Sequence, residues 1–152
     1  MIKIMFVCYG NICRSPMAEF VFKDMVNKKG LQDKFYISSS ATSCEELGNS
    51  VYPPVKEILK SKGIDTSGKY AQRLQKTDYE KFDMFIGMDS SNIRSINRIF
   101  GSDPEGKIKK MMDFTSLGGD VADPWYTRDF QRTYDDIYKA CTYLLEECLK
   151  TM

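Results

Sequence analysis

The stretch Val7–Glu19, VCYGNICRSPMAE, decides how the N-terminal part of the chain folds. The apolar run Ile4–Val7 leads into it and a helical pattern follows, so the sequence predicts a strand, a tight loop and a helix. Gly10 permits a positive φ and a close backbone approach, Ser15 can cap the helix, and Pro16 suits its first turn. The predicted loop between strand and helix is therefore short.

Cys8 at the start of this loop and Arg14 at its end form a candidate phosphate site. Successive loop N–H groups and a helix N-terminus make an anion seat, and the Arg14 guanidinium can bind two phosphate oxygens. The same positive field favours the thiolate form of Cys8, which would be a nucleophile aimed at phosphorus. The alternative, a half-buried strand-end cysteine beside a surface arginine, would not require Gly10, Ser15 and Pro16 together.

The segment CYGNICRSPMAE, residues 8–19, resembles the signature of the low-molecular-weight protein tyrosine phosphatases. Their nucleophilic Cys, five intervening residues and Arg lie close to the N-terminus. The resemblance continues through SSSATS at 38–43, MDSSN at 88–92 and DPWY at 123–126. It implies a phosphatase without metal or cofactor that acts on phosphotyrosine proteins through a phosphocysteine at Cys8.

Length and composition narrow the class of protein further. The 152 residues fit one domain, 1–152, and 22 basic against 21 acidic residues imply no broad field for nucleic acid or membranes. No stretch approaches the roughly 20 apolar residues of a membrane span. Five cysteines without a small-scaffold spacing favour a reducing cytoplasm. We expect a monomer with at most weak self-association.

The absence of histidine restricts the chemistry most. It excludes Cys–His and Ser–His–Asp catalysis and most zinc sites, so the proton carriers should be carboxylates. Asp123 is the best candidate for the general acid because Pro124 restricts it to an extended conformation just before the last helix. On position alone Asp113, Asp120 and Asp129 compete with it, whereas the resemblance assigns the acid to Asp123.

The rest of the chain alternates strands with helices. Strands are expected at 35–40, 84–88 and, less clearly, 108–112, where two lysines interrupt the apolar pattern. Helices are expected from Pro54 to Gly63, from Asp89 or Ser90 to Gly101, and from about Asp129 onward, and a capping box at 77–80 predicts a short one. The sequence thus predicts an α/β fold, a doubly wound four-stranded parallel sheet with helices on both faces.

The resemblance also assigns supporting roles around the loop. It implies that Ser15 donates to the thiolate, that Asn11 in a left-handed turn bonds Ser39, and that Asp89, an ordinary helix cap by itself, braces the loop. The expected phosphate-binding and substrate-binding residues are Tyr9, Gly10, Asn11, Ile12, Cys13, Ser15, Trp125 and Tyr126. Tyr9, Trp125 and Tyr126 would be aromatic walls deep enough for phosphotyrosine.

Two positions differ from the family pattern, and two others bear on redox behaviour and on the choice of substrate. Glu45 stands where members often carry a further aromatic residue, and the stretch near Lys69 lacks a histidine that many members have. Cys13 is the implied redox partner of the nucleophile. Ile12 replaces the threonine of members that act on phosphoarginine, so phosphotyrosine should be preferred. Arsenate reductase shares this loop, but its additional cysteine pair is absent from residues 84–95.

Overall fold

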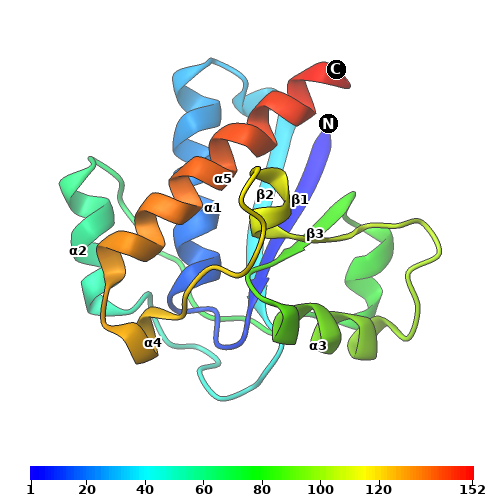
Figure 1. Cartoon of the computed structure of the whole chain (residues 1–152), viewed down its shortest axis with the longest axis horizontal. Helices are drawn as coiled ribbons and strands as arrows, with labels where there is room; N and C mark the ends of the chain where they lie inside the picture. The colour runs from blue at the N-terminus through cyan, green and yellow to red at the C-terminus, as the bar shows by residue number, and fades with distance from the viewer.

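The computed structural model describes all 152 residues, and its four strands form one parallel sheet in the order β2-β1-β3-β4 (Figure 1). The strands are β1 (Ile2–Cys8), β2 (Phe35–Ala41), β3 (Met84–Gly87) and β4 (Ile108–Lys110). The helices are α1 (Arg14–Lys28), α2 (Pro53–Ser61), α3 (Ser90–Phe100), α4 (Pro124–Thr127) and α5 (Phe130–Lys150). Short 3₁₀ turns occupy Gln32–Lys34, Lys76–Glu80 and Met111–Phe114.

Strand β1 is buried on both faces, as a central parallel strand requires. Its Ile4, Phe6 and Cys8 side chains join a core with α1, α2 and α5, whereas Met5 and Val7 join a second core with α3. Figure 1 shows α1, α2 and α5 on one side of the sheet and α3 on the other. The predicted doubly wound α/β architecture is confirmed.

Helix α1 begins one residue before the cap that the sequence predicts. Cys13 occupies the N-cap position without a side-chain cap, so Ser15 is the second helical residue and the capping prediction for it is wrong. The Ser15 hydroxyl instead lies against the Cys8 sulfur, and a side chain so engaged cannot reach the free N–H groups of the helix. Pro16 lies in the first turn as predicted. Gly30, with φ of 68°, follows the last turn.

Three other boundaries differ from the predictions. Helix α2 starts at Pro53 rather than Pro54, because Tyr52 is its extended N-cap. The capping box near residue 77 is formed by Gln75 and Asp78, so the short turn starts earlier than predicted. Strand β4 ends at Lys110, since the chain turns there to bury Met111 and Met112 in the core.

The candidate loop lies beyond the carboxyl end of β1, where the order β2-β1-β3-β4 changes direction. Sheets of this type bind ligands at such a switch point. Asp89 caps α3 by accepting from the Asn92 N–H at 2.7 Å, so the start of α3 lies at the same edge of the sheet. None of the helices combines the length and apolar character that crossing a membrane requires.

Candidate active site

Cys8 is the last residue of β1 and its sulfur receives donors from the loop above it. The Asn11 backbone N–H lies 3.3 Å from Sγ, and the Ser15 Oγ lies 2.9 Å from it. Asn11 has φ of 60°, the left-handed conformation expected of it, which turns this N–H back toward the sulfur. The loop backbone and the Ser15 hydroxyl therefore converge on the Cys8 sulfur.

The loop also offers backbone N–H groups to an anion. Those of Gly10, Ile12 and Cys13 form no hydrogen bond within the protein, and they stand directly before the N-terminus of α1. Unpaired N–H groups at a helix start bind phosphate because the helix dipole and the donors act together. The loop therefore has the features of a phosphate seat over the Cys8 sulfur.

Arg14 is buried, and two partners fix its guanidinium. Its Nη1 donates to Asp89 Oδ2 and to the Val121 carbonyl oxygen, both at 2.8 Å. Its Nη2 lies 3.6 Å from Asp123 Oδ2. The contact between Asp89 and Arg14 is consistent with the bracing role that the resemblance implies for Asp89. One edge of the guanidinium is thus held by the protein, and the other lies beside the candidate general acid.

A chain of polar side chains under the loop fixes the direction of the donors. Glu19 Oε1 accepts the Ser39 hydroxyl proton at 2.5 Å, which leaves Ser39 Oγ to accept from Asn11 Nδ2 at 2.9 Å. Asn11 Nδ2 also donates to Ser15 Oγ at 2.8 Å, which leaves the Ser15 proton for the Cys8 sulfur at 2.9 Å or the Ser40 carbonyl oxygen at 3.4 Å. Glu19 thus orients the Ser39 hydroxyl, and the Asn11 side-chain amide links Ser39 to Ser15 beside the sulfur.

Lys69 provides the positive charge beside this carboxylate. Its Nζ donates to the Ser39 carbonyl oxygen at 2.8 Å and lies 3.4 Å from Glu19 Oε1. Burial lowers the pKa of Lys69, and the attraction of Glu19 opposes that shift. Gln72 completes the support, since its backbone N–H donates to Asn11 Oδ1 at 3.1 Å. An ammonium group thus joins the network near the place where the family pattern has a histidine.

A cleft of about 190 Å³ opens above the loop, and its lining includes Asp123 and the three predicted aromatic residues. The exposed fractions are 50% for Tyr9, 46% for Trp125 and 83% for Tyr126, so these rings border the cleft rather than the core. Glu45 lies at the same border and accepts the Tyr9 hydroxyl proton at 2.8 Å, which raises the pKa of Tyr9. A carboxylate therefore stands at the rim.

The other three candidate acids lie outside this cleft. Asp113 lines a wider groove of about 980 Å³ between α3, β4 and α5, and Asp129 caps α5 by accepting from the Arg132 N–H. Asp120 bonds Lys110 at 3.0 Å. Asp123 is the one candidate of the four in the lining, where its Oδ1 also accepts from the Trp125 N–H at 3.0 Å as the cap of α4.

The remaining cysteines differ sharply in their surroundings. Cys13 also lines the cleft, and burial raises its pKa to about 12, with the negative charges of Cys8 and Asp123 adding to the shift. Cys141 is fully buried in the core and burial raises its pKa as well. The structure contains no group of three or more His, Cys, Asp or Glu side chains that could hold a metal ion.

Comparison with known proteins gives this arrangement a family. The profile described as "Low molecular weight phosphotyrosine protein phosphatase" matches residues 3–152. The chain belongs to this family. The phosphatase is 38% identical over 152 residues to the low molecular weight protein-tyrosine-phosphatase YfkJ of Bacillus subtilis, covering 99% of this chain and 97% of that one. It is 42% identical over 128 residues to the Schizosaccharomyces pombe low molecular weight phosphotyrosine protein phosphatase, covering 82% and 81%.

Solved structures agree with the family assignment. The crystal structure of YfkJ superimposes with a TM-score of 0.96 at 37% identity and covers 99% of this chain and 96% of that one. The structure of a drosophila arginine phosphatase has a TM-score of 0.88 at 27% identity, with 96% and 97% covered. The phosphatase is thus a hydrolase of the protein-tyrosine-phosphatase class whose fold also occurs in a protein named for arginine phosphatase activity.

Three contributors to the site were absent from the predictions. Glu19 lies four residues after Ser15 on the same helical face, and this spacing could have revealed it. Lys69 lies in a stretch, residues 65–82, without clear periodicity, so its approach to Glu19 had no signal. Val121 contributes only its backbone carbonyl oxygen, and a contact of the backbone cannot be predicted from the residue type.

Proposed function

We propose that this phosphatase hydrolyses phosphotyrosine through a phosphocysteine on Cys8, with Arg14 as phosphate clamp and Asp123 as general acid and then base. The observation that carries the proposal is the meeting of the three side chains at one cleft, although Asp123 is more than 100 residues from the loop. The unpaired N–H groups of Gly10, Ile12 and Cys13 support a phosphoryl group directly above the sulfur.

Both chemical steps follow from this placement. The Cys8 thiolate attacks phosphorus, the bond from phosphorus to the phenolic oxygen breaks, and Asp123 gives its proton to the departing oxygen. The Asp123 carboxylate then takes a proton from water, which attacks the phosphocysteine and releases phosphate and the thiolate. Arg14 and the loop N–H groups neutralise the charge on the transferring oxygens in both steps.

The walls of the cleft support an aryl phosphate as substrate. Tyr9, Trp125 and Tyr126 offer ring faces to a phenyl group, and a shorter phosphoserine would leave its phosphate above the seat. The expected partners are phosphotyrosine proteins. The phosphatase is expected to work as a monomer with at most weak self-association, in a reducing cytoplasm and without a cofactor.

A steady-state assay of phosphotyrosine turnover in EDTA, with arsenate reduction measured alongside, tests the proposal. We expect turnover that EDTA does not reduce and no arsenate reduction, because residues 84–95 lack the cysteine pair that a disulfide relay needs. Arsenate reduction without phosphatase activity would favour the rival enzyme. Phosphotyrosine binding without turnover would favour a noncatalytic binding module.

Cys13 is proposed as the redox partner of Cys8. Peroxide would oxidise the Cys8 thiolate to a sulfenic acid, and the Cys13 thiol in the same cleft would displace water from it to form a disulfide. The wild type should then recover activity in dithiothreitol, whereas Cys13→Ser should lose it permanently. Equal recovery of the two proteins would leave Cys13 a packing residue.

A further inference from the structure

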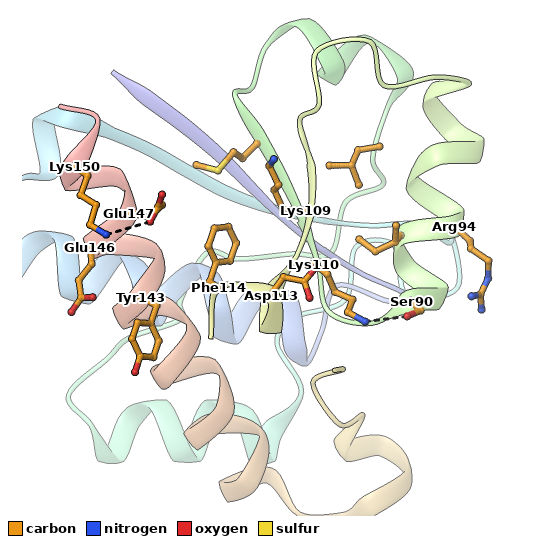
Figure 2. A pocket seen from close by; sticks show the side chains of 13 residues that line it. Ser90, Arg94, Lys109, Lys110, Asp113, Phe114, Tyr143, Glu146, Glu147 and Lys150 are labelled. Carbon is orange, nitrogen blue, oxygen red and sulfur yellow. Dashed lines mark hydrogen bonds and ion pairs between the residues drawn. The ribbon is translucent and has the colours of Figure 1, made fainter. Parts of the chain in front are cut away.

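Asp120, in the segment between β4 and α4, is held by residues from two other parts of the chain. Its Oδ1 accepts from Lys110 Nζ at 3.0 Å, from the Ser90 backbone N–H at 3.2 Å and from the Ser90 hydroxyl at 3.4 Å. Lys110 Nζ also donates to Ser90 Oγ at 3.2 Å, the bond drawn at the edge of the groove in Figure 2. We refer to Ser90, Lys110 and Asp120 as the clasp.

The clasp fixes the segment directly after Gly118 and Gly119, where the backbone has the most conformational freedom. Gly118 and Gly119 have φ of 62° and 84°, and a Cβ on either would meet no atom within 4 Å. Two glycines in open space leave the backbone many alternatives to this conformation. After Asp120, the Val121 N–H donates to the Met88 carbonyl oxygen at 2.9 Å. Asp120 is therefore the first residue after the glycine pair that is tied to the sheet edge.

The clasp is connected to the catalytic residues on both sides. Ser90 directly follows Asp89, whose carboxylate holds Arg14 at 2.8 Å. Val121 directly follows Asp120, and its carbonyl oxygen accepts from Arg14 at 2.8 Å. A displaced Asp120 would move Val121, and with it the segment that brings Asp123 to the cleft.

The geometry excludes Asp120 as the general acid. Its side chain is half exposed and lies outside the cleft lining, and one of its oxygens already accepts from three donors. The hydrogen bond from Lys110 holds the pKa of Asp120 below its usual range. A carboxylate in this state has no proton to give at neutral pH.

We propose that Asp120, through Lys110 and Ser90, is a positioning residue that keeps Asp123 within reach of the leaving-group oxygen. The proposal rests on the acid role of Asp123 in the proposed function. The ion pair is partly exposed, so its contribution to stability is small. Proton transfer is nevertheless sensitive to small displacements of the acid, and we expect a loss of about threefold to tenfold in kcat/KM for a substrate with a poor leaving group when the clasp is broken.

The experiment compares Asp120→Ala and Lys110→Met with Lys109→Met, a matched control. Lys109 is the adjacent lysine and is exposed, and its side chain forms no hydrogen bond or ion pair in the structure. For each variant, kcat/KM, which reports formation of the phosphocysteine, is measured with phenyl phosphate, whose phenolate is a poor leaving group, and with p-nitrophenyl phosphate, whose nitrophenolate is a good one. The inhibition constant of inorganic phosphate and the melting temperature are measured alongside, and Asp123→Asn is assayed in the same series.

The clasp variants should lose about threefold to tenfold in kcat/KM for phenyl phosphate but less than about twofold for p-nitrophenyl phosphate, with phosphate inhibition unchanged. The double variant of Asp120 and Lys110 should be no slower than the worse single variant. An equal loss with both substrates, no loss, or the same loss in Lys109→Met would overturn the proposal. If Asp123→Asn itself showed no dependence on the leaving group, the acid assignment would fail instead.

Discussion

The loop of residues 8–15, the floor of the cleft, and the segment of residues 118–128, its wall, are built in opposite ways. Asn11, Arg14 and Ser15 on the floor are buried, and each has at least two polar contacts. On the wall, Asp123 keeps 32% of its side chain exposed and Tyr126 is 83% exposed. The floor is buried and organised before substrate arrives, whereas the side chains of Asp123 and Tyr126 on the wall stay exposed to solvent.

This difference separates two kinds of mutational effect. A change on the floor should alter the nucleophile, the phosphate seat and the stability of the fold together, because its groups are buried and partnered. A change on the wall should alter proton transfer or substrate choice and leave stability nearly untouched. Each measurement below can confirm or break this separation.

The largest effect is expected from Cys8→Ser on the floor. Turnover should be abolished, because a serine hydroxyl in this site is not ionised and cannot replace the thiolate. Binding of tungstate, a phosphate analogue, should stay measurable by calorimetry since Arg14 and the loop N–H groups remain. Arg14→Ala should damage both binding and turnover. Substantial activity in the serine variant would rule out the thiolate mechanism.

The next largest effect is expected from Asp123→Asn on the wall. Turnover should fall by about 10²–10⁴ for poor leaving groups and much less for nitrophenol, because only the former need a proton. Asparagine also caps helices, so α4 should persist and the melting temperature should hardly change. A uniform loss across leaving groups would move the acid elsewhere, and a large fall in stability would contradict the contrast between floor and wall.

The floor was largely predictable because its signals are local. The strand, Gly10, Pro16 and the helical pattern lie within 20 residues, and their order specified the loop after β1. Ser15 was the exception, since its position before the helical pattern suggested a cap and its contact with Cys8 was expected only from the family resemblance. Local patterns cannot reveal which long-range partner a hydroxyl will find.

The wall and the pair of Glu19 and Lys69 under the floor could not be predicted in this way, because they depend on contacts between segments that are distant in the sequence. Sequence position left four aspartates as acids, and only the fold shows which of them lines the cleft. Glu19 and Lys69 are 50 residues apart in the sequence, and neither glutamate nor lysine is a residue type that indicates burial. The fold class was predictable because it needs only the alternation of elements, whereas these pairings need the final packing.

The third prediction tests the buried support of the floor through Glu19→Gln. Its side chain is 6% exposed and that of Lys69 is 9% exposed, so the change leaves an ammonium in the protein without its counter-charge. Removing one partner of such a pair should lower the free energy of unfolding by about 3 kcal/mol. Urea denaturation measures it, and Glu19→Gln combined with Lys69→Met should recover part of the loss.

Lys23→Met is the matched control for this prediction. Lys23 pairs with the same carboxylate, but its side chain is 39% exposed, and the change should cost less than about 1 kcal/mol. The pH dependence provides a second measurement. Because the pKa of Lys69 is lowered in the folded state, the unfolded chain keeps the Lys69 proton above that pKa, and the contribution of Lys69 to stability, measured as the difference between the wild type and Lys69→Met, should rise with pH up to about 10.4. In Glu19→Gln this rise should begin at a lower pH, because the attraction of Glu19 no longer opposes the lowering of the Lys69 pKa by burial.

The smallest effect is expected from Ile12→Thr, which lies where the floor meets the substrate. Ile12 lines the cleft, and its branched apolar side chain can pack against an aryl ring but offers no hydrogen bond to a phosphoramidate. Among the structural neighbours of this fold is a drosophila arginine phosphatase, so the scaffold itself does not decide the substrate.

We therefore expect the wild type to prefer phosphotyrosine over phosphoarginine, and Ile12→Thr to narrow or reverse that preference by about tenfold to hundredfold. Because Ile12 takes no part in the network of Glu19 and Ser15, the variant should show the same loss of turnover on Cys8→Ser, and its melting temperature should fall only slightly because Ile12 is partly buried against the core. The ratio of kcat/KM for the two substrates in both proteins decides the matter. A wild type that prefers phosphoarginine would overturn the tyrosine assignment while leaving the Cys8 mechanism intact, and an unchanged ratio in the variant would place substrate choice on the wall alone.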